Sequence, residues 1–505
     1  MQSLISTLKN DPVRQFAFLA LGITLARIIA LFFSDIDLGP DETQYWFWSQ
    51  TPTFGYFSKP PMIAWAIAVT TSIFGNAEWA VRASAPFFHL ITASFIFLAT
   101  RSRYDEQSAL WAGLIWLTLP SATLSSMVIS TDALLLSFWS ASLYLFLRLT
   151  STKEQTSRKA SMLAAFLGAA IGLGFLSKYA MIYFLIGVTG SIILAGMRLS
   201  WRNAAIAATV GLLVLTPNLL WNANHGFQTL SHTAANANWQ GDLYHPIALI
   251  EFLLAQFAVF GPITFALFIA GLVTFNKKLK SAAEKKGTDL ALLCFAVPPI
   301  VIVAIQAFIS RAHANWAAAA FPAATILVAG WAMRARKTIF LKGAVLINII
   351  ASLVFMTAAT NFSLVDRVGL SEVVKRVRGW EQQGNYIAQL SVTYDAVMVD
   401  DREVMGGVLY YARTSDIPVV AWNSNSRIDH HYEAFHSFRP TKYQRLLYVT
   451  PHSDAIAVRN QFDTIKHIGE TTADLKMGRY RRLYLFELDG YRYLRGDLLD
   501  EDEPL

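Results

Sequence analysis

Long apolar segments alternate with short polar connections over the first 361 residues of the chain. A transmembrane α-helix needs about 20 consecutive, mostly apolar residues. Segments of about that length lie at residues 13–33, 80–100, 108–122, 131–148, 161–176, 179–197, 203–220, 246–274, 289–309, 315–333 and 342–361. The pattern therefore predicts a polytopic α-helical membrane protein with about eleven spans. Residues 61–79 are also apolar, but Gly75, Asn76 and Glu78 favour an interfacial helix there, with a further span as the alternative.

The pattern changes after residue 361, where apolar runs become short and polar residues frequent. Residues 362–505 suffice for one small domain. Period-two and continuous apolar runs predict strands at 396–401, 417–422, 445–450 and 482–488, and helical patterns fall at 371–383, 404–413 and 453–465. Strands that alternate with helices indicate a small α/β domain. The acidic tail at 497–505 has a composition typical of disorder. We therefore expect a transmembrane domain over 1–361, including an outer loop at 34–79, and a second domain over 362–505.

Composition supports a membrane protein and excludes several other classes. Hydrophobic residues make up 54% of the 505 residues and charged residues only 15%, whereas soluble domains carry about 25% charged residues. The net charge of +7 does not indicate nucleic-acid binding, because the basic residues lie mostly between apolar segments. The one cysteine, Cys294, permits neither a disulfide nor a thiolate metal site within the chain. No phosphate-binding glycine loop is present, which argues against a nucleotide-sugar or ATP site.

Basic residues predict the orientation of the chain in the membrane. Those in one set of connections are Lys9, Arg14, Arg101, Arg103, Arg148, Lys153, Arg158, Lys159, Arg198, Arg202, Lys277, Lys278, Lys280, Lys285, Lys286, Arg334, Arg336, Lys337 and Lys342. The short connections of the opposite side hold only Lys59, Arg82, Lys178 and Arg311. Because basic residues concentrate on the cytoplasmic side, we expect a cytoplasmic N-terminus and an outer loop at 34–79. The first apolar segment lacks a small-residue cleavage site and is expected to be an anchor. An odd number of spans then places the C-terminal domain outside as well.

Seven charged residues at the outer ends of spans are not explained by orientation. They are Asp41, Glu42, Lys59, Arg82, Asp132, Lys178 and Arg311, and His313 follows the last of them closely. Each alone is accounted for by snorkelling or by helix capping. Their common position on one face favours a shared functional site.

The stretch from Asp35 to Pro61 combines three features of such a site. An acidic pair, Asp41-Glu42, is followed by four aromatic residues at 45–48 and by a lone Lys59 before two prolines. A general base, an aromatic shelf at headgroup level and a cation for phosphate suggest chemistry on a lipid-linked phosphate. The alternative is structural: acids favour a helix start, Pro40 suits its first position, and the aromatics suit an interfacial belt.

The outer loop at 221–246 carries His225, His232 and His245 among several asparagines and glutamines. Their only nearby carboxylate is Asp242, and the histidine spacings match no metal-ligand motif, so the metal signal is weak. Hydrogen bonding to a hydroxylated ligand, such as an acceptor, or simple solvation of the loop explains these residues better.

Several motifs together resemble a known class of enzymes. GPDETQYWFWSQ and GYFSKPPMIAW, followed by STDALLLSFW, GLGFLSKYAM, TPNLLWNANHGFQTLSH and ANWAAAAFPA, are similar to motifs of bacterial GT-C membrane glycosyltransferases. The related groups are the dolichyl-phosphate-mannose protein mannosyltransferases and the lipid A aminoarabinose transferase. The resemblance covers residues 12–361 and extends into the second domain through VDDREVMGGVLYYAR and VVAWNSNSRIDHHYE. It specifies neither the sugar nor the acceptor.

The resemblance implies roles for individual residues. Asp41 matches the acid taken as catalytic base, with Glu42 beside it, and Asp132 matches an acid that lines the site. Lys59 and Lys178 match basic positions near the donor phosphate. Arg82, Arg311 and His313 are added to the phosphate-binding set from the charge distribution alone.

The implied reaction is transfer of a sugar from a polyprenyl-phosphate donor to an envelope glycan, lipid or protein, with inversion at the anomeric carbon. One base and two cations suffice for direct displacement, so we expect no catalytic metal and no cofactor. The expected location is the outer face of a bacterial inner membrane, facing the periplasm in a Gram-negative cell.

Two other functions remain as alternatives. A transporter or flippase of lipid-linked sugars would also need spans and basic residues, but it predicts internal repeats and midplane charges, which the sequence does not show. A non-catalytic sugar sensor is the third hypothesis, and the presence of Asp41 argues against it.

Overall fold

The computed structural model describes residues 11–239, 243–275, 283–425, 427–440 and 442–492. The acidic tail, Lys9, Asp242 and the lysines at 277, 278 and 280 lie outside the described residues. Contacts between Cα atoms divide the chain into two units. The first, here called the membrane unit, comprises Met1–Ser34, Thr53–Gly55 and Lys59–Thr360. The second, the sheet unit, comprises Asp35–Pro52, Tyr56–Ser58 and Asn361–Leu505 and so includes part of the outer loop.

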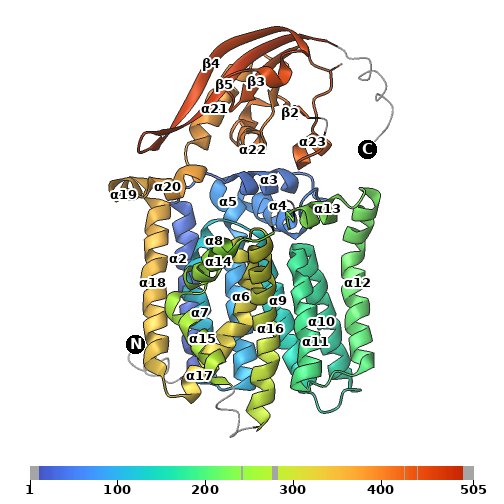
Figure 1. Ribbon diagram of the computed structural model, residues 1–505, viewed down its shortest axis with the longest axis vertical. Coiled ribbons are helices and arrows are strands. Elements are labelled where there is room, and N and C mark those ends of the chain that lie inside the picture. The colour runs from blue at the N-terminus through green and yellow to red at the C-terminus, as the bar shows by residue number, and fades with distance from the viewer. Residues whose placement is uncertain (1–10, 240–242, 276–282, 426, 441, 493–505) are drawn as a thin grey trace. The chain divides into compact units, whose positions relative to one another are not determined.

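The membrane unit is helical, and its long helices run roughly parallel to one another (Figure 1). Within the described residues, eight helical stretches are long and apolar enough to cross a membrane. They are α2 (Pro12–Phe32), α5 with α6 (Glu78–Arg82 and Ser84–Arg103), α9 (Thr131–Thr150), α10 (Arg158–Ser177), α12 (Trp201–Asn224), α16 (Ala283–Ile309), η2 with α17 (Ala314–Ala320 and Phe321–Arg334) and α18 (Thr338–Thr360). The prediction of a polytopic helical membrane protein is confirmed.

The remaining expected spans are helical, but each is either bent or too short to cross a membrane as one straight helix. Helices α14 (Pro246–Val259) and α15 (Pro262–Phe275) form a pair bent by 114° around Gly261. The shorter helices are α4 (Met62–Phe74), α7 (Glu106–Thr118), α8 (Pro120–Met127), η1 (Tyr179–Met181), α11 (Ile182–Ala195) and α13 (Gln228–Ala235). The expected count of about eleven spans is therefore approximate, because apolar length alone does not reveal bends and short helices.

Burial separates central helices from those at the edge of the membrane unit. The apolar stretch formed by η2 and α17 is 83% buried and that of α9 is 72% buried, whereas the values for α12 and α18 are 17% and 22%. Close packing is achieved by small residues: a Cβ on Gly168 of α10 would lie 2.2 Å from the carbonyl oxygen of Ala207 in α12. Small residues at such crossings let helix backbones approach in a membrane.

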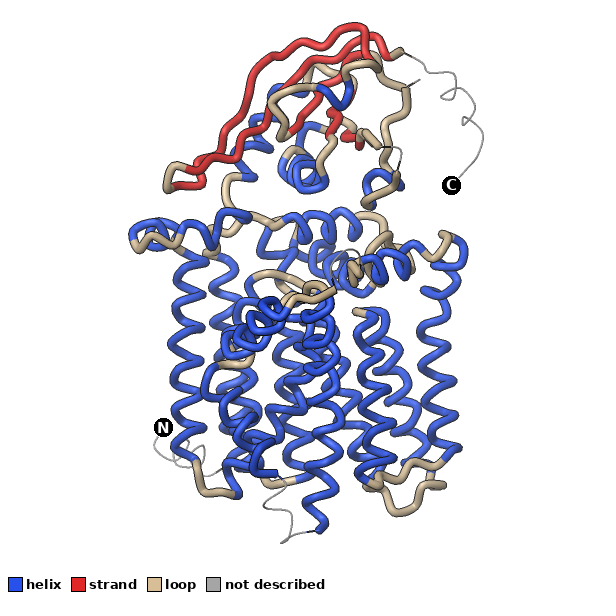
Figure 2. Tube along the Cα trace, viewed as in Figure 1, coloured by secondary structure: helices blue, strands red, loops and turns tan. Residues whose placement is uncertain are grey.

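The sheet unit contains all five described strands (Figure 2). They are β1 (Ala396–Val399), β2 (Val419–Ala421), β3 (Arg445–Thr450), β4 (Phe462–Lys476) and β5 (Arg479–Tyr491), arranged in the order β2-β1-β3-β5-β4. The first three are parallel, and β5 is antiparallel to both β3 and β4. Strand β1 is buried along its whole length, as expected of a continuous apolar run in a parallel sheet.

Helices and short turns complete the sheet unit. They are α3 (Pro40–Ser49), α19 (Phe362–Arg367), α20 (Ser371–Val374), η3 (Lys375–Val377), α21 (Trp380–Ser391), α22 (Arg402–Tyr411), η4 (Arg413–Ser415), α23 (His431–Phe435) and η5 (Ile456–Val458). The small α/β domain is therefore confirmed, and the helix predicted at 404–413 is found as α22 with shifted ends. The segment predicted as one helix at 371–383 is instead divided between α20, η3 and the first turn of α21.

One predicted element of this domain is wrong. The segment expected as a helix at 453–465 contains only the short turn η5 before β4 begins at Phe462. Strand β4 lies at the sheet edge and only three of its fifteen residues are buried, so its sequence lacks the apolar run by which the other strands were found. It is held by pairing with β5 through the tight turn Met477-Gly478, whose two residues both have positive φ.

Helix α3 packs against α22, and a glycine makes this approach possible. A Cβ on Gly406 of α22 would lie 2.4 Å from Oγ1 of Thr43 in α3. Since real Cβ atoms do not tolerate such a separation, any side chain at position 406 would require Thr43 or one of the two helices to shift. The contact sets the first turn of α22 beside the acidic first turn of α3.

Candidate active site

Glu42 has the capping role that was one alternative for the acidic pair. Pro40 occupies the first position of α3, and the Glu42 carboxylate accepts a hydrogen bond of 3.0 Å from the backbone N–H of Gly39. The Glu42 side chain is buried within the sheet unit. A buried, hydrogen-bonded carboxylate at the third position of a helix satisfies an otherwise unpaired N–H.

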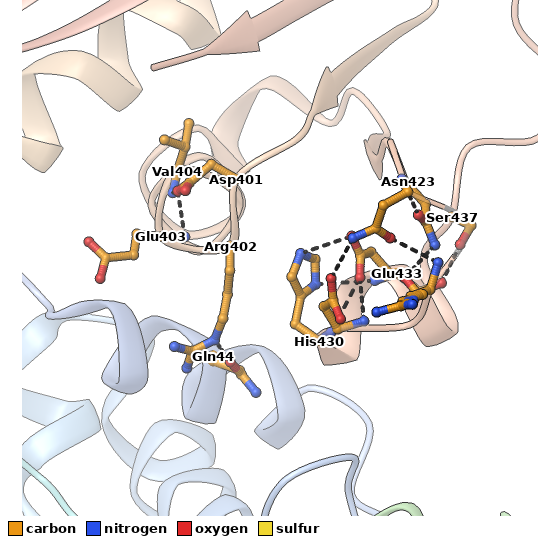
Figure 3. A network of polar contacts seen from close by, with 12 residues as sticks. Gln44, Asp401, Arg402, Glu403, Val404, Asn423, His430, Glu433 and Ser437 are labelled. Atoms are coloured by element: carbon orange, nitrogen blue, oxygen red, sulfur yellow. Dashed lines mark hydrogen bonds and ion pairs between the residues drawn. The ribbon is translucent and has the colours of Figure 1, made fainter. Parts of the chain in front are cut away.

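Asp41 lies beside Glu42 but in a different environment. Its side chain is 67% exposed, and Oδ1 accepts a hydrogen bond of 2.6 Å from Nη2 of Arg402. The same guanidinium donates through Nε to Oε1 of Gln44 at 2.7 Å. Figure 3 shows Arg402 reaching from the start of α22 to Gln44. Asp41 is thus a solvent-accessible carboxylate paired with a cation from the C-terminal part of the chain.

Local structure fixes the position of Arg402. It is the first residue of α22, directly after Asp401, whose carboxylate accepts hydrogen bonds from the backbone N–H groups of Glu403 and Val404 at 2.8 and 2.9 Å. Burial lowers the pKa of Arg402, but the charge and hydrogen bond of Asp41 outweigh that effect and leave the pKa above its ordinary value. Arg402 therefore remains charged beside Asp41.

The aromatic residues of α3 do not form the expected shelf at headgroup level. Tyr45, Trp46 and Trp48 are buried in the sheet unit. Trp46 packs edge-on against Tyr410 of α22, with ring centroids 4.9 Å apart, and Trp48 stacks on Tyr56 at 4.6 Å. This expectation was wrong because the rings serve as the core between α3 and its neighbours in the same unit.

A group of histidines lies next to these rings. His431 of α23 contacts Trp48 edge-on at 5.4 Å and Phe47 at 6.3 Å between centroids. Burial lowers the pKa of His431 to about 3, with further lowering by the neighbouring His436 and His430. His431 is therefore a neutral, buried side chain near pH 7 and contributes packing at this position.

The membrane unit holds a second polar group, formed by residues from three helical segments. Nζ of Lys178, at the end of α10, lies 2.7 Å from Oδ1 of Asp132, in the first turn of α9. Oδ2 of Asp132 accepts a hydrogen bond of 2.8 Å from Nδ2 of Asn315 in η2. The side chains of Lys178 and Asp132 are only 21% and 12% exposed. Because each oxygen of Asp132 accepts a hydrogen bond, the geometry suits an acid that holds Lys178 in place.

Tyr179 continues this group toward the outer loop. Its hydroxyl donates to Oδ1 of Asn218 in α12 at 2.9 Å, and Nδ2 of Asn218 donates to the carbonyl oxygen of Phe54 at 2.7 Å. Nε1 of Trp65 in α4 donates to the carbonyl oxygen of Thr53, the residue before Phe54, at 2.8 Å. The short segment Thr53–Gly55 is thus held by two helices of the membrane unit, a few residues before Lys59.

The other candidate residues of the membrane unit occupy varied surroundings. Arg82 is fully buried, Lys59 is half-buried, and Arg311 and His313 are exposed. His313 directly precedes η2, which carries Asn315, and its ring packs edge-on against Trp316. Among the candidate residues of this unit, the structure brings Asp132 and Lys178 into direct contact.

The loop histidines make contacts within their own segment. His225 stacks on Trp221 at 4.1 Å between ring centroids, and its Nδ1 lies 2.8 Å from the carbonyl oxygen of Trp221. Nδ1 of His232 lies 3.4 Å from Nδ2 of Asn236. The described part of the chain contains no cluster of three or more His, Cys, Asp or Glu side chains that could hold a metal ion.

Sequence reasoning missed Gln44, Arg402 and Asn315. All three lie inside motifs that carry the family resemblance, but their contacts were not foreseen. Asn315 is uncharged, so sorting the outer face by charge could not reveal it. Arg402 pairs with an acid 361 positions earlier, and only the packing of α22 on α3 joins them.

Comparison with known proteins decides the family. The chain is 32% identical over 413 residues to the lipid A galacturonosyltransferase RgtD of Rhizobium johnstonii, covering 81% of this chain and 85% of the relative. The chain belongs to the GT-C membrane glycosyltransferases. The family described as dolichyl-phosphate-mannose-protein mannosyltransferase matches residues 58–221 of this glycosyltransferase, a segment that includes Lys59, Asp132 and Lys178.

Solved structures show the same fold for this glycosyltransferase. ArnT from Cupriavidus metallidurans bound to undecaprenyl phosphate gives a TM-score of 0.65 at 15% identity, covering 98% of this chain and 99% of that one. The apo form of the same protein gives the same score over 94% and 97%. Membership of the GT-C glycosyltransferases shows that the chain is an enzyme. The transporter and sensor alternatives are therefore not favoured.

Proposed function

We propose that this glycosyltransferase moves a sugar from a polyprenyl-phosphate donor to lipid A or a closely related envelope glycolipid, on the outer face of the inner membrane. The similarity to a lipid A galacturonosyltransferase over most of both chains supports lipid A as acceptor and a uronic acid as the first donor sugar to test. The likeness to ArnT, which is solved with undecaprenyl phosphate, shows only the fold, but it agrees with a polyprenyl carrier.

The observation that carries the proposal is the exposed Asp41 carboxylate in the first turn of α3. An acceptor hydroxyl attacks the anomeric carbon, a new carbon–oxygen bond forms, and the bond from that carbon to the phosphate oxygen breaks. Asp41 takes the hydroxyl proton, for which it must approach within about 3 Å of the hydroxyl oxygen. Direct displacement by one nucleophile inverts the anomeric centre.

The departing polyprenyl phosphate gains one negative charge during this reaction. We assign Lys59 and Lys178 to stabilise that charge, and Asp132 and Asn315 to hold Lys178 in position. One well-placed electrostatic group contributes about 3–4 kcal/mol to the transition state. Arg82, Arg311 and His313 are further candidates for contacts with the donor phosphate, and His225 and His232 for contacts with the acceptor.

The positions of the basic residues support the proposed orientation. The connections richest in arginine and lysine belong on the cytoplasmic side by the positive-inside rule. The opposite connections, with Lys59, Arg82, Lys178 and Arg311, then face outward, as does the C-terminal sheet unit. An enzyme that takes its sugar from a polyprenyl phosphate on that face does not need a binding site for a nucleotide sugar.

Mass spectrometry of envelope glycolipids and polyprenyl-phosphate sugars tests the proposal in cells that carry either the wild-type protein or Asp41→Asn. We expect the variant to accumulate a lipid-linked sugar and to lack one sugar on lipid A. Asp35→Asn is the matched control, because Asp35 is another exposed acid of the same loop and accepts a hydrogen bond from the backbone N–H of Phe362. Equal lipid pools in wild-type and Asp41→Asn cells, with both proteins folded and present, would refute the proposed function.

A further inference from the structure

The arginine that pairs with Asp41 comes from the C-terminal part of the chain and has no role in the reaction described above. Arg402 bonds two acceptors, Asp41 and Gln44, that lie three residues apart on one face of α3. Residues three apart are neighbours on a helix surface, so a planar guanidinium can reach both. The two bonds fix the guanidinium plane relative to α3.

The position of this guanidinium is built into the fold of the sheet unit. Strand β1 ends at Val399, Asp401 caps α22, and Arg402 follows at the first helical position. One turn later Gly406 allows α22 to lie against Thr43 of α3. The helix packing therefore delivers Arg402 to Asp41, and the contact does not depend on a flexible loop.

The surroundings of Arg402 favour a charge effect on Asp41. The titratable side chains whose charges act on Arg402 from the packed elements are Asp41 and Tyr45 of α3 and Tyr432 of α23, and Arg402 in turn acts on His430, which precedes α23. Burial raises the pKa of Tyr432 and lowers that of His430, so both are neutral near pH 7. Asp41 is thus the anionic partner of Arg402 in this group.

We propose that Arg402 is a positioning residue, which keeps Asp41 ionised and oriented for proton removal from the acceptor hydroxyl. The assignment rests on the proposed role of Asp41 as base. An adjacent arginine favours the ionised form of an aspartate, so the base stays available at lower pH. The hydrogen bond to Gln44 restrains the arginine and thereby the direction from which Asp41 presents its carboxylate.

The test is the pH dependence of kcat/KM for the purified full-length enzyme, with a synthetic polyprenyl-phosphate galacturonic acid as donor and lipid A as acceptor. The acid limb of this profile reports ionisation of the base in the free enzyme. Without Arg402 the folded-state pKa of Asp41 rises, so activity is lost at a higher pH. Because the pair is partly exposed, we expect Arg402→Gln to move the acid limb upward by about 0.5–1 pH unit.

Two further variants separate the charge effect from a general loss of structure. Arg402→Lys keeps the charge but not the planar fork, so we expect a lower kcat with an acid limb close to that of the wild type. Arg445→Gln is the matched control, because Arg445 forms an ion pair with Glu487 at 2.7 Å elsewhere in the sheet unit. Its profile should coincide with the wild type. Each enzyme sample is returned to pH 7 after exposure to the assay pH, and it must regain its full rate, which shows that the pH did not unfold it.

The outcomes distinguish this inference from the proposed function. If wild type transfers sugar, Asp41→Asn does not, and Arg402→Gln has an unshifted acid limb, the positioning role is refuted while the base assignment stands. A change confined to KM in Arg402→Gln also refutes it, because that result indicates substrate binding by the arginine. If Asp41→Asn turns over as fast as wild type, the role of Asp41 itself is refuted.

Discussion

Asp132 and Lys178 form the most buried acid–base pair among the candidate residues, and their coupling is open to a direct test. The two side chains are 12% and 21% exposed, with 2.7 Å between Oδ1 and Nζ. If Asp132 acts only by holding Lys178, the two residues function as one unit. The double variant Asp132→Asn/Lys178→Ala should then be no worse than Lys178→Ala alone.

The structure sets the magnitude of each loss. At an effective dielectric constant of about 20, two charges at the observed 2.7 Å attract by about 6 kcal/mol before desolvation is subtracted. Removing one partner of a buried ion pair costs about 3–5 kcal/mol. Because this pair is partly exposed, we expect the cost of removing either partner to lie near the lower end, at about 3 kcal/mol. If Lys178 stabilises the leaving phosphate by about 3 kcal/mol, Lys178→Ala lowers kcat about 100-fold. Asp132→Asn should lower kcat by about 10- to 100-fold, since its amide still accepts a hydrogen bond from Lys178.

Initial rates of sugar transfer in detergent, measured for the wild type, both single variants and the double variant, complete the cycle. Contacting residues that act together show strong non-additivity, whereas independent residues add their free energies. Lys178→Arg serves as the control that keeps the charge, and thermal unfolding shows that each variant is folded. Losses that multiply in the double variant would show that Asp132 acts independently of Lys178, and the positioning argument would fail.

Three further predictions concern packing and pH. Gly406→Ala should lower the free energy of unfolding by about 1–3 kcal/mol, because the new Cβ would lie 2.4 Å from Oγ1 of Thr43. Thermal unfolding should show that the double variant Gly406→Ala/Thr43→Ala regains most of the lost stability. Gly168→Leu should separate α10 from α12, because the new Cβ would lie 2.2 Å from the carbonyl oxygen of Ala207. Size-exclusion chromatography in detergent should then show a lower yield of folded protein. His431 has its folded pKa lowered to about 3, below the unfolded value of about 6.5, so its contribution is intact above pH 6.5 and is lost as pH falls toward 3. Between pH 7.5 and 5.5 this loss is about 1.4 kcal/mol, and His431→Gln should remove that part of the pH dependence of unfolding.

Much of the fold was predictable from apolar length and periodicity. The long helices of the membrane unit are apolar runs of about the length that a membrane span requires, and strands β1, β2, β3 and β5 are short apolar runs. The failures occur where stability comes from elsewhere. Strand β4 depends on backbone pairing at a sheet edge, and the bend between α14 and α15 depends on the positive φ of Gly261. Neither property leaves a strong periodic signal in the chain.

The candidate site was predictable to a smaller extent. Charges that orientation did not explain led to Asp132 and Lys178, which the structure joins, because an unpaired charge at a span end is costly. The same argument cannot find Asn315 or Gln44, which carry no charge. It cannot find Arg402 either, because arginine is ordinary in a domain outside the membrane and only tertiary packing brings it to α3.

The acidic pair of α3 shows why its structural and functional explanations could not be separated in the sequence. Both carboxylates lie in the first turn, where the helix dipole favours negative charge whatever their use. Glu42, at the third position, turns back to the Gly39 N–H and is buried, whereas Asp41 remains exposed and meets Arg402. Because Glu42 supplies the cap, the Asp41 carboxylate is not needed for it. In α3 the hydrogen bonds therefore assign the capping role to Glu42 and leave Asp41 as the candidate base, a distinction that the sequence alone could not make.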